Sequence, residues 1–199
     1  TIDMSLNGGL GAVINKNAVI LNGDIVPGKL TAVKHGNGID WWLIGHLYNS
    51  YSYVKFLIDS AGIHGPYNIG AGVLRLDATG QCAFSADGNK MAYYDVITDL
   101  DIFDFDRCSG TLSNFIHIAI DDSAQSAGVA FSPSGRFLYV PSMHYLYQYD
   151  LQSSNIDSSR ITVGIWDGFY FLKPHFVIYF FIVQLSLDNK IYINCFNGL

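Results

Sequence analysis

Aspartates form the densest group of ionisable side chains in this chain. They lie close together in one stretch, as Asp95, Asp99, Asp101, Asp104 and Asp106. Carboxylates converging from a loop suit calcium, whereas carboxylates two residues apart on a strand share one face of it. Apolar residues alternate with the last three aspartates, as in a strand with one buried and one solvated face. We therefore interpret them as a solvated strand face and predict no metal site.

Hydrolytic chemistry would need a nucleophile with a base beside it. The 6 histidines are scattered along the chain, and no Gly-x-Ser-x-Gly elbow is present to expose a serine. All 17 acidic residues are aspartate, so the glutamate of many acid–base pairs is missing. We predict no catalytic residue set and no cofactor.

The 3 cysteines, Cys82, Cys108 and Cys195, lack the paired spacing of a zinc site. Small buried side chains on strands explain them best, with one disulfide as the alternative. Trp41 and Trp42, followed by Tyr51, form a local concentration of aromatic residues. Trp41, Trp42 and Tyr51 are possible ligand-binding aromatics, since neighbouring strand residues face opposite ways and one tryptophan can be exposed while the other packs in the core. Packing in the core is the leading interpretation.

A repeated pattern predicts the elements that position these residues. An aromatic or aliphatic residue and a serine precede a Gly or Asn turn, and an aliphatic–aromatic strand follows, in residues 84–93, 131–139 and 185–192. A weaker copy lies at 34–42, and the copies recur about every 50 residues, near the period of a four-stranded propeller blade. The sequence thus predicts an all-β fold, a β-propeller of four-stranded antiparallel blades in an incomplete ring of about three full blades.

We expect one propeller segment over residues 1–199. Its predicted units are approximately 28–64, 65–115, 116–160 and 161–199, with strands of an adjoining blade in 1–27 and a fourth unit that lacks its outer strands. Equivalent positions at the end of each unit's first strand hold four polar residues. These possible channel-lining residues are His35, Ser85, Ser132 and Ser186, for which hydrogen bonding within the turns is the simpler interpretation.

Charge and hydropathy limit the partners. The net charge is −6 and the 11 Lys and Arg residues are not clustered, which argues against nucleic acid. The apolar run at 176–183 is far shorter than the roughly 20 residues of a membrane-spanning helix. We predict no membrane span and expect this run to form a strand buried on both faces.

Several strings resemble the WD40-like propeller region of secreted Bacteroidetes proteins that carry a type IX secretion sorting domain. They are residues 3–11, 29–35 with 40–42, 103–110, 128–136, 138–140, 148–151, and 184–185 with 188–193. The resemblance implies a secreted or cell-surface location and a longer parent protein, and it brings no catalytic residues. We therefore predict a non-enzymatic module that binds protein or glycan or has a structural role.

Two alternatives remain open. Residues 131–140 also resemble the repeat of seven-bladed lactonases, whose site would need Arg, His and acidic residues converging in the channel. The chain also fits a spacer within a large adhesin, and no residue separates a spacer from a binding module.

Overall fold

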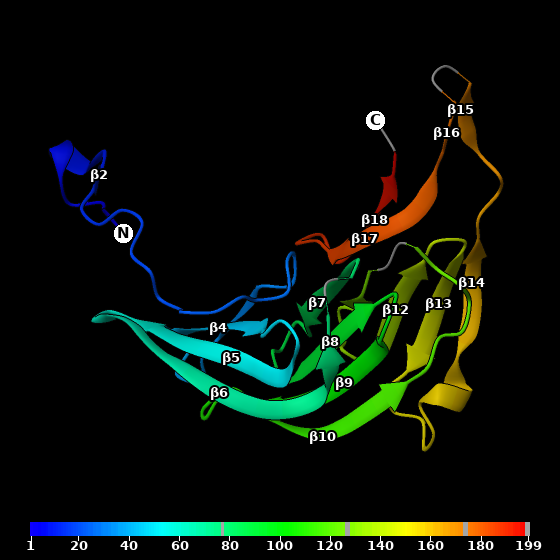
Figure 1. Cartoon of the computed structure of the whole chain (residues 1–199), viewed down its shortest axis with the longest axis horizontal. Helices are drawn as coiled ribbons and strands as arrows, with labels where there is room; N and C mark the ends of the chain where they lie inside the picture. Colours follow the sequence, from blue (N-terminus) through cyan, green and yellow to red (C-terminus); the bar gives the residue numbers. More distant parts are fainter. Residues whose placement is uncertain (77, 126–127, 173–174, 198–199) are drawn as a thin grey trace.

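The computed structural model describes residues 1–76, 78–125, 128–172 and 175–197. Three four-stranded antiparallel sheets follow one another along the chain and stand side by side in an open arc (Figure 1). The helices in this part of the chain are two short 3-10 turns, η1 (Asn7–Gly9) and η2 (Asp157–Ser159). The predicted all-β propeller with an incomplete ring is confirmed.

The strands of each blade are consecutive in sequence. Blade 1 consists of β3 (Thr31–Lys34), β4 (Trp41–His46), β5 (Ser50–Asp59) and β6 (Gly62–Arg75). Blade 2 consists of β7 (Gly80–Phe84), β8 (Lys90–Asp95), β9 (Asp99–Asp106) and β10 (Thr111–Ile118). Blade 3 consists of β11 (Ala130–Phe131), β12 (Phe137–Ser142), β13 (Tyr145–Asp150) and β14 (Ile161–Ile165).

The repeated sequence pattern builds the turn between the first two strands of a blade. Gly88 and Gly135 have φ of 74° and 71°, in the left-handed region where a side chain is strained. The serine before each turn fixes its geometry, since Oγ of Ser85 accepts a hydrogen bond from the backbone N–H of Lys90 at 3.0 Å. Ser132 does the same for Phe137, also at 3.0 Å. The turn-capping interpretation therefore describes both serines.

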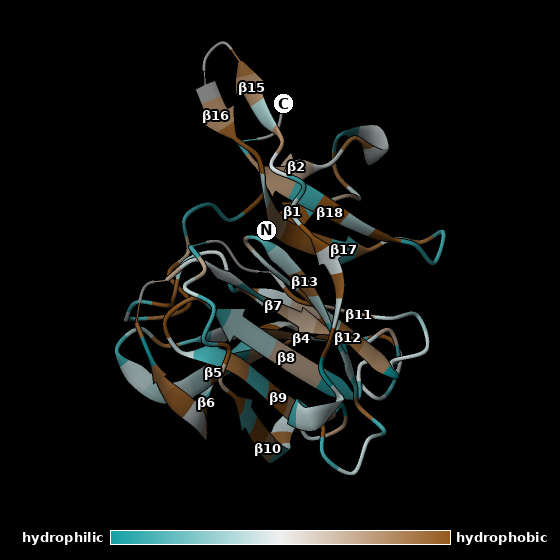
Figure 2. Cartoon of the chain, turned by 90° about the vertical axis from the view of Figure 1, so that its right-hand side faces the viewer, coloured by the Kyte–Doolittle hydropathy of each residue, from teal (hydrophilic) through white to brown (hydrophobic). Residues whose placement is uncertain are grey.

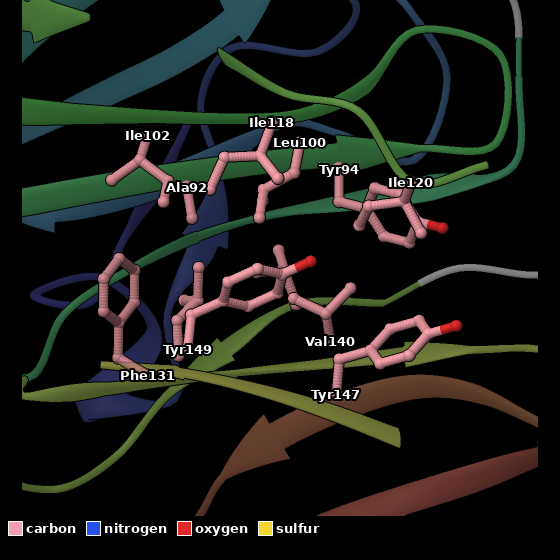
Figure 3. Close-up of a cluster of buried hydrophobic side chains, with 12 residues drawn as sticks. Ala92, Tyr94, Leu100, Ile102, Ile118, Ile120, Phe131, Val140, Tyr147 and Tyr149 are labelled. Atoms are coloured by element: carbon pink, nitrogen blue, oxygen red, sulfur yellow. The ribbon is translucent and has the colours of Figure 1, made fainter. Parts of the chain in front are cut away.

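The core lies between the blades. Figure 3 shows Leu100, Ile102 and Ile118 of blade 2 pointing toward Phe131 and Tyr149 of blade 3. A second cluster fills the junction of blades 1 and 2, from Val33, Trp42, Ile44, Tyr53, Cys82, Met91, Tyr93, Phe103 and Phe105. Blade 2 is consequently covered on both sides.

This packing corrects the prediction for the aspartate stretch. Asp101 is fully buried and Asp95 is 1% exposed, although they were expected on a solvated face. Both faces of β9 meet a neighbouring sheet, so a side chain on either face is removed from water there. Asp104 and Asp106 lie further along β9 and are only partly covered or exposed.

The segment before blade 1 pairs with the end of β4 at the edge of that blade. Before this segment, β1 (Ile2–Asp3) and β2 (Ala12–Val13) pair only with each other and lie away from the three blades (Figure 1). Residues 24–30 then lie against β4: the backbone N–H of Val26 donates to the carbonyl of His46 at 2.9 Å. A Cβ placed on Gly45 would meet Leu30 at 3.3 Å and Ile25 at 3.7 Å. We call residues 24–30 the strap.

The C-terminal strands extend beyond the blades. β15 (Tyr170–Leu172) pairs with β16 (His175–Val177), and β17 (Tyr179–Leu185) pairs with β18 (Ile191–Phe196), as two separate two-stranded sheets. Figure 2 shows them projecting past the blades, with apolar stretches. The run at 176–183 is therefore two strands, and the prediction of burial on both faces is wrong. Val183 is buried, but Phe176 and Ile182 are 48% and 38% exposed because no other sheet of the described residues covers them.

The cysteine prediction is correct for one residue. Cys82 is buried on β7, whereas Cys108 and Cys195 are exposed, and all three are free thiols. Cys108 lies in the turn after β9 rather than on a strand, which explains its exposure.

Candidate axial binding groove

The innermost strands of the blades meet at a cavity of about 520 Å³. Strands β3, β7 and β11 form three of its walls, and β17 lies along them as the fourth. Its walls combine small apolar side chains such as Ala83 and Ala130 with polar groups near the turns. The size and the mixed lining are those of a small-ligand site.

One side-chain amide joins three of these strands. Nε2 of Gln81 on β7 donates to the carbonyl of Val183 on β17 at 2.7 Å. Its Oε1 accepts from the backbone N–H of Val183 at 3.1 Å and from that of Val129, just before β11, at 3.2 Å. These strands lack a regular ladder between them, and Gln81 supplies the hydrogen bonds that a ladder would provide.

The rim of the groove carries an indole and three charges. Trp41 is 42% exposed, and Nζ of Lys34 lies 5.7 Å from the centre of its ring, a cation–π distance. Asp87 and Arg107 line the same cavity. Burial alone would raise the pKa of Asp87, but hydrogen bonds from Ser85 and Asn89 outweigh it and lower this pKa below its usual value. Asp87 is therefore a carboxylate at neutral pH.

The structure separates the residues proposed as channel-lining. Ser85 lines the groove, but His35, Ser132 and Ser186 do not line it. Nε2 of His35 lies 3.0 Å from the carbonyl oxygen of Cys108, where the β3–β4 turn of blade 1 meets the β9–β10 turn of blade 2. The backbone N–H of Ser186 donates to the carbonyl of Lys190 at 2.9 Å, closing the β17–β18 turn.

The aromatic residues also have different surroundings. Trp41 reaches the groove, while Trp42 is buried and donates from Nε1 to the carbonyl of Arg107 at 2.8 Å. Nζ of Lys55 stacks on Trp42 at 4.8 Å from the ring centre. Tyr51 is 62% exposed near the opposite end of blade 1, since it is the second residue of β5 whereas Trp41 pairs with Ile58 near the end of β5. One surface cannot present all three rings to a single small ligand.

A buried ionic network, which the sequence reasoning missed, connects blades 1 and 2 at the end of β6. Arg75 is fully buried; its Nη1 donates to Asp95 at 2.8 Å and its Nη2 to Asp101 at 2.5 Å. Nη1 also donates to Thr98 Oγ1. Nδ1 of His117 lies 2.8 Å from the second oxygen of Asp101. Burial opposes the charge on Arg75, but attraction by Asp101 and other groups outweighs it and raises the pKa of Arg75.

Arg75 gave a weak sequence signal. It ends an otherwise apolar and Gly-rich stretch, and its partners lie 20 and 26 residues away. Burial of Asp95 and Asp101 depends on blade packing, which a single-strand pattern does not contain. Among the described residues, no three His, Cys or Asp side chains are arranged to hold a metal ion.

Solved structures with a similar fold include propellers. A gluconolactonase from Xanthomonas campestris has a TM-score of 0.51 at 13% identity, over 88% of this chain and 59% of that one. The Dos1 propeller has a TM-score of 0.50 at 12% identity, over 85% and 39%. A protein of unknown function from Desulfotomaculum acetoxidans has a TM-score of 0.50 at 8% identity, over 88% and 64%. At these identities the likeness shows the fold alone.

The chain spans less than two thirds of the length of each of these structures. No protein-family model and no curated protein matches the sequence. No helix among the described residues is long and apolar enough to cross a membrane.

Proposed function

We propose that this chain is a non-enzymatic binding module whose axial groove holds a glycan. The observation that carries the proposal is Trp41, an exposed indole at the rim of a cavity lined by polar side chains. Sugar rings present an apolar C–H face and a fringe of hydroxyls, so they need a flat aromatic surface beside hydrogen-bonding groups. Lys34, Asp87 and Arg107 supply those groups at the same rim.

The charges favour a glycan with an acidic substituent. Lys34 and Arg107 carry two positive charges, against the single carboxylate of Asp87, which already accepts hydrogen bonds from Ser85 and Asn89. A sugar carboxylate or sulfate would meet both cations, and guanidinium binds such groups through paired hydrogen bonds.

An enzyme is the weaker alternative. Lactonase-like chemistry would need an Arg, a His and carboxylates open to the channel. In this chain the residues of these types that lie together are the buried network centred on Arg75, Asp95 and Asp101. All three are at most 1% exposed, so a substrate in the groove would not reach them. If the groove binds no ligand, the remaining alternative is that the chain is a structural spacer.

The location and the parent protein belong to the same proposal. The resemblance described above supports a secreted or cell-surface module, within a longer protein that carries a type IX secretion sorting domain. A glycan ligand suits that location, because glycans are displayed outside cells.

The test is a glycan array followed by calorimetry on the best ligand. We expect acidic glycans to bind, Trp41→Ala to lose at least tenfold in affinity, and Tyr51→Ala, exposed but remote from the groove, to bind like the parent chain. Equal loss in both variants, or no binding to any glycan, would contradict the proposal. Hydrolysis of gluconolactone by the parent chain would favour the enzyme instead.

A further inference from the structure

Four buried polar atoms at the junction of blades 1 and 2 have no hydrogen-bond partner among the described residues. They are the hydroxyls of Tyr53 and Tyr93, Nε of Arg75 and Nε2 of His46. The ring centres of His46 and Tyr53 are 4.4 Å apart, and those of His46 and Tyr93 are 5.8 Å apart. Cζ of Arg75 lies 4.2 Å from the Tyr93 ring centre. We call these four residues the junction group.

Such a concentration needs a physical explanation. An unpaired buried polar group destabilises the folded state, and buried polar groups in proteins are nearly always paired with protein or with water. Each of the four is at most 1% exposed, so bulk solvent does not reach them.

The hydrogen-bonding chemistry of the junction group is complementary to water. Nδ1 of His46 lies 2.8 Å from the carbonyl oxygen of Leu47, which only accepts, so Nδ1 carries the proton. Burial lowers the pKa of His46 to about 4, so the ring is neutral at pH 7 and Nε2 is an acceptor. Nε of Arg75 is a donor, and the two hydroxyls act as either.

The charges around the junction group balance. Arg75 and Lys29 provide two positive charges and Asp95 and Asp101 two negative charges, and all four residues are at most 2% exposed. A halide would add an unbalanced charge and would face the Nε2 acceptor of His46. A neutral ligand that both donates and accepts is the better match.

We propose that the junction group is an internal hydration site, in which ordered water accepts from Nε of Arg75 and donates to Nε2 of His46. The hydroxyls of Tyr53 and Tyr93 complete its coordination. Water with several protein partners is an integral part of a folded structure. Here it would join residues from β4, β5, β6 and β8, and thus both blades.

A high-resolution crystal structure of the full chain tests the site directly. We expect a water peak within hydrogen-bonding distance of at least two of the four atoms, and no anomalous peak there after soaking in bromide. An empty site would overturn the proposal, and so would a bromide peak, because it would identify a halide site.

Two conservative variants give an independent test in solution. If water satisfies the hydroxyls, Tyr53→Phe and Tyr93→Phe each remove a formed hydrogen bond, and the unfolding equilibrium constant rises several-fold in urea at pH 7. If the hydroxyls are unpaired, their removal relieves a desolvation penalty and the midpoint stays or rises, which would overturn the proposal. Tyr94→Phe calibrates the loss, since the buried Tyr94 hydroxyl has a known partner in Ser142 Oγ at 2.9 Å.

Discussion

At the scale of single residues, the buried charges matter more for the stability of the fold than the exposed ones. Arg75 and its two aspartates are almost fully withdrawn from water, whereas the ion pair of Arg136 with Asp150 is solvated, with side chains 47% and 25% exposed. A buried carboxylate that loses its cation keeps its desolvation penalty, while a solvated one regains water. The two arginines therefore offer a matched comparison.

Replacement of Arg75 should strongly destabilise the fold. Arg75→Met leaves Asp95 and Asp101 buried without their cation, and we expect a loss of about 3 to 5 kcal/mol in the free energy of unfolding. Urea denaturation followed by tryptophan fluorescence measures it. Arg136→Met is the control and should leave the midpoint near that of the parent chain. Similar small effects in both variants would show that the Arg75 network is not holding the blades.

His46 should make stability depend on pH. Its folded pKa is about 4 against an ordinary value of 6.5, with burial as the largest cause. Between these values the unfolded chain binds a proton that the folded chain excludes, so stability is complete above pH 6.5 and falls as pH decreases toward 4. His46→Asn, which keeps a donor for the Leu47 carbonyl, should flatten the urea midpoint over this window. An unchanged slope would assign the pH dependence to another group.

At the scale of elements, the sequence predicted the turns within the blades but not the contacts between blades. Ser85, Gly88 and their counterparts Ser132 and Gly135 act within a few residues of their partners, so a sequence pattern contains the whole interaction. Gln81 instead acts on residues 48 and 102 positions away. Its role depends on where β17 lies, which no local pattern specifies.

The contact through Gln81 gives a prediction for β17. Gln81→Met removes three hydrogen bonds and leaves the N–H groups of Val129 and Val183 without their partner, so we expect a loss of about 2 kcal/mol. Hydrogen exchange should accelerate in β17 more than in blades 1 to 3. Gln152→Met, in an exposed turn, serves as the control. Unchanged protection of Val183 would mean that β17 is held by packing alone.

At the scale of the whole molecule, the open arc gives the three thiols different accessibility. Cys82 lies in the junction of blades 1 and 2, and burial raises its pKa to about 12, while Cys108 and Cys195 are exposed. Thiols react as thiolates, so Cys82 is protected both by its covering and by its protonation.

Thiol labelling should therefore report on the separation of blades. With 5,5′-dithiobis(2-nitrobenzoic acid) at pH 8 we expect two thiols to react in the folded chain and the third only in urea. The Arg75→Met variant should expose Cys82 at lower urea than the parent chain does. Rapid reaction of all three thiols without denaturant would contradict the burial of this junction.

Sequence reasoning thus predicted the fold class but little of the groove. The repeat predicted the blades because each blade is built from residues that are neighbours in sequence. The alternation of side chains along a strand indicated that one tryptophan could face out. The same alternation wrongly predicted a solvated Asp101, because it cannot show that both faces of a sheet are covered. Lys34, Asp87 and Arg107 come together only through the packing of different strands and turns.

The strap makes the two sides of the arc unequal. Residues 24–30 pair with the end of β4 at the edge of blade 1, and the side chains of Ile25 and Leu30 lie beside Gly45 there. The opposite side presents the uncovered apolar side chains of Phe176, Ile182 and Phe196. The C-terminal side of the arc thus offers an apolar surface on which a further sheet can pack.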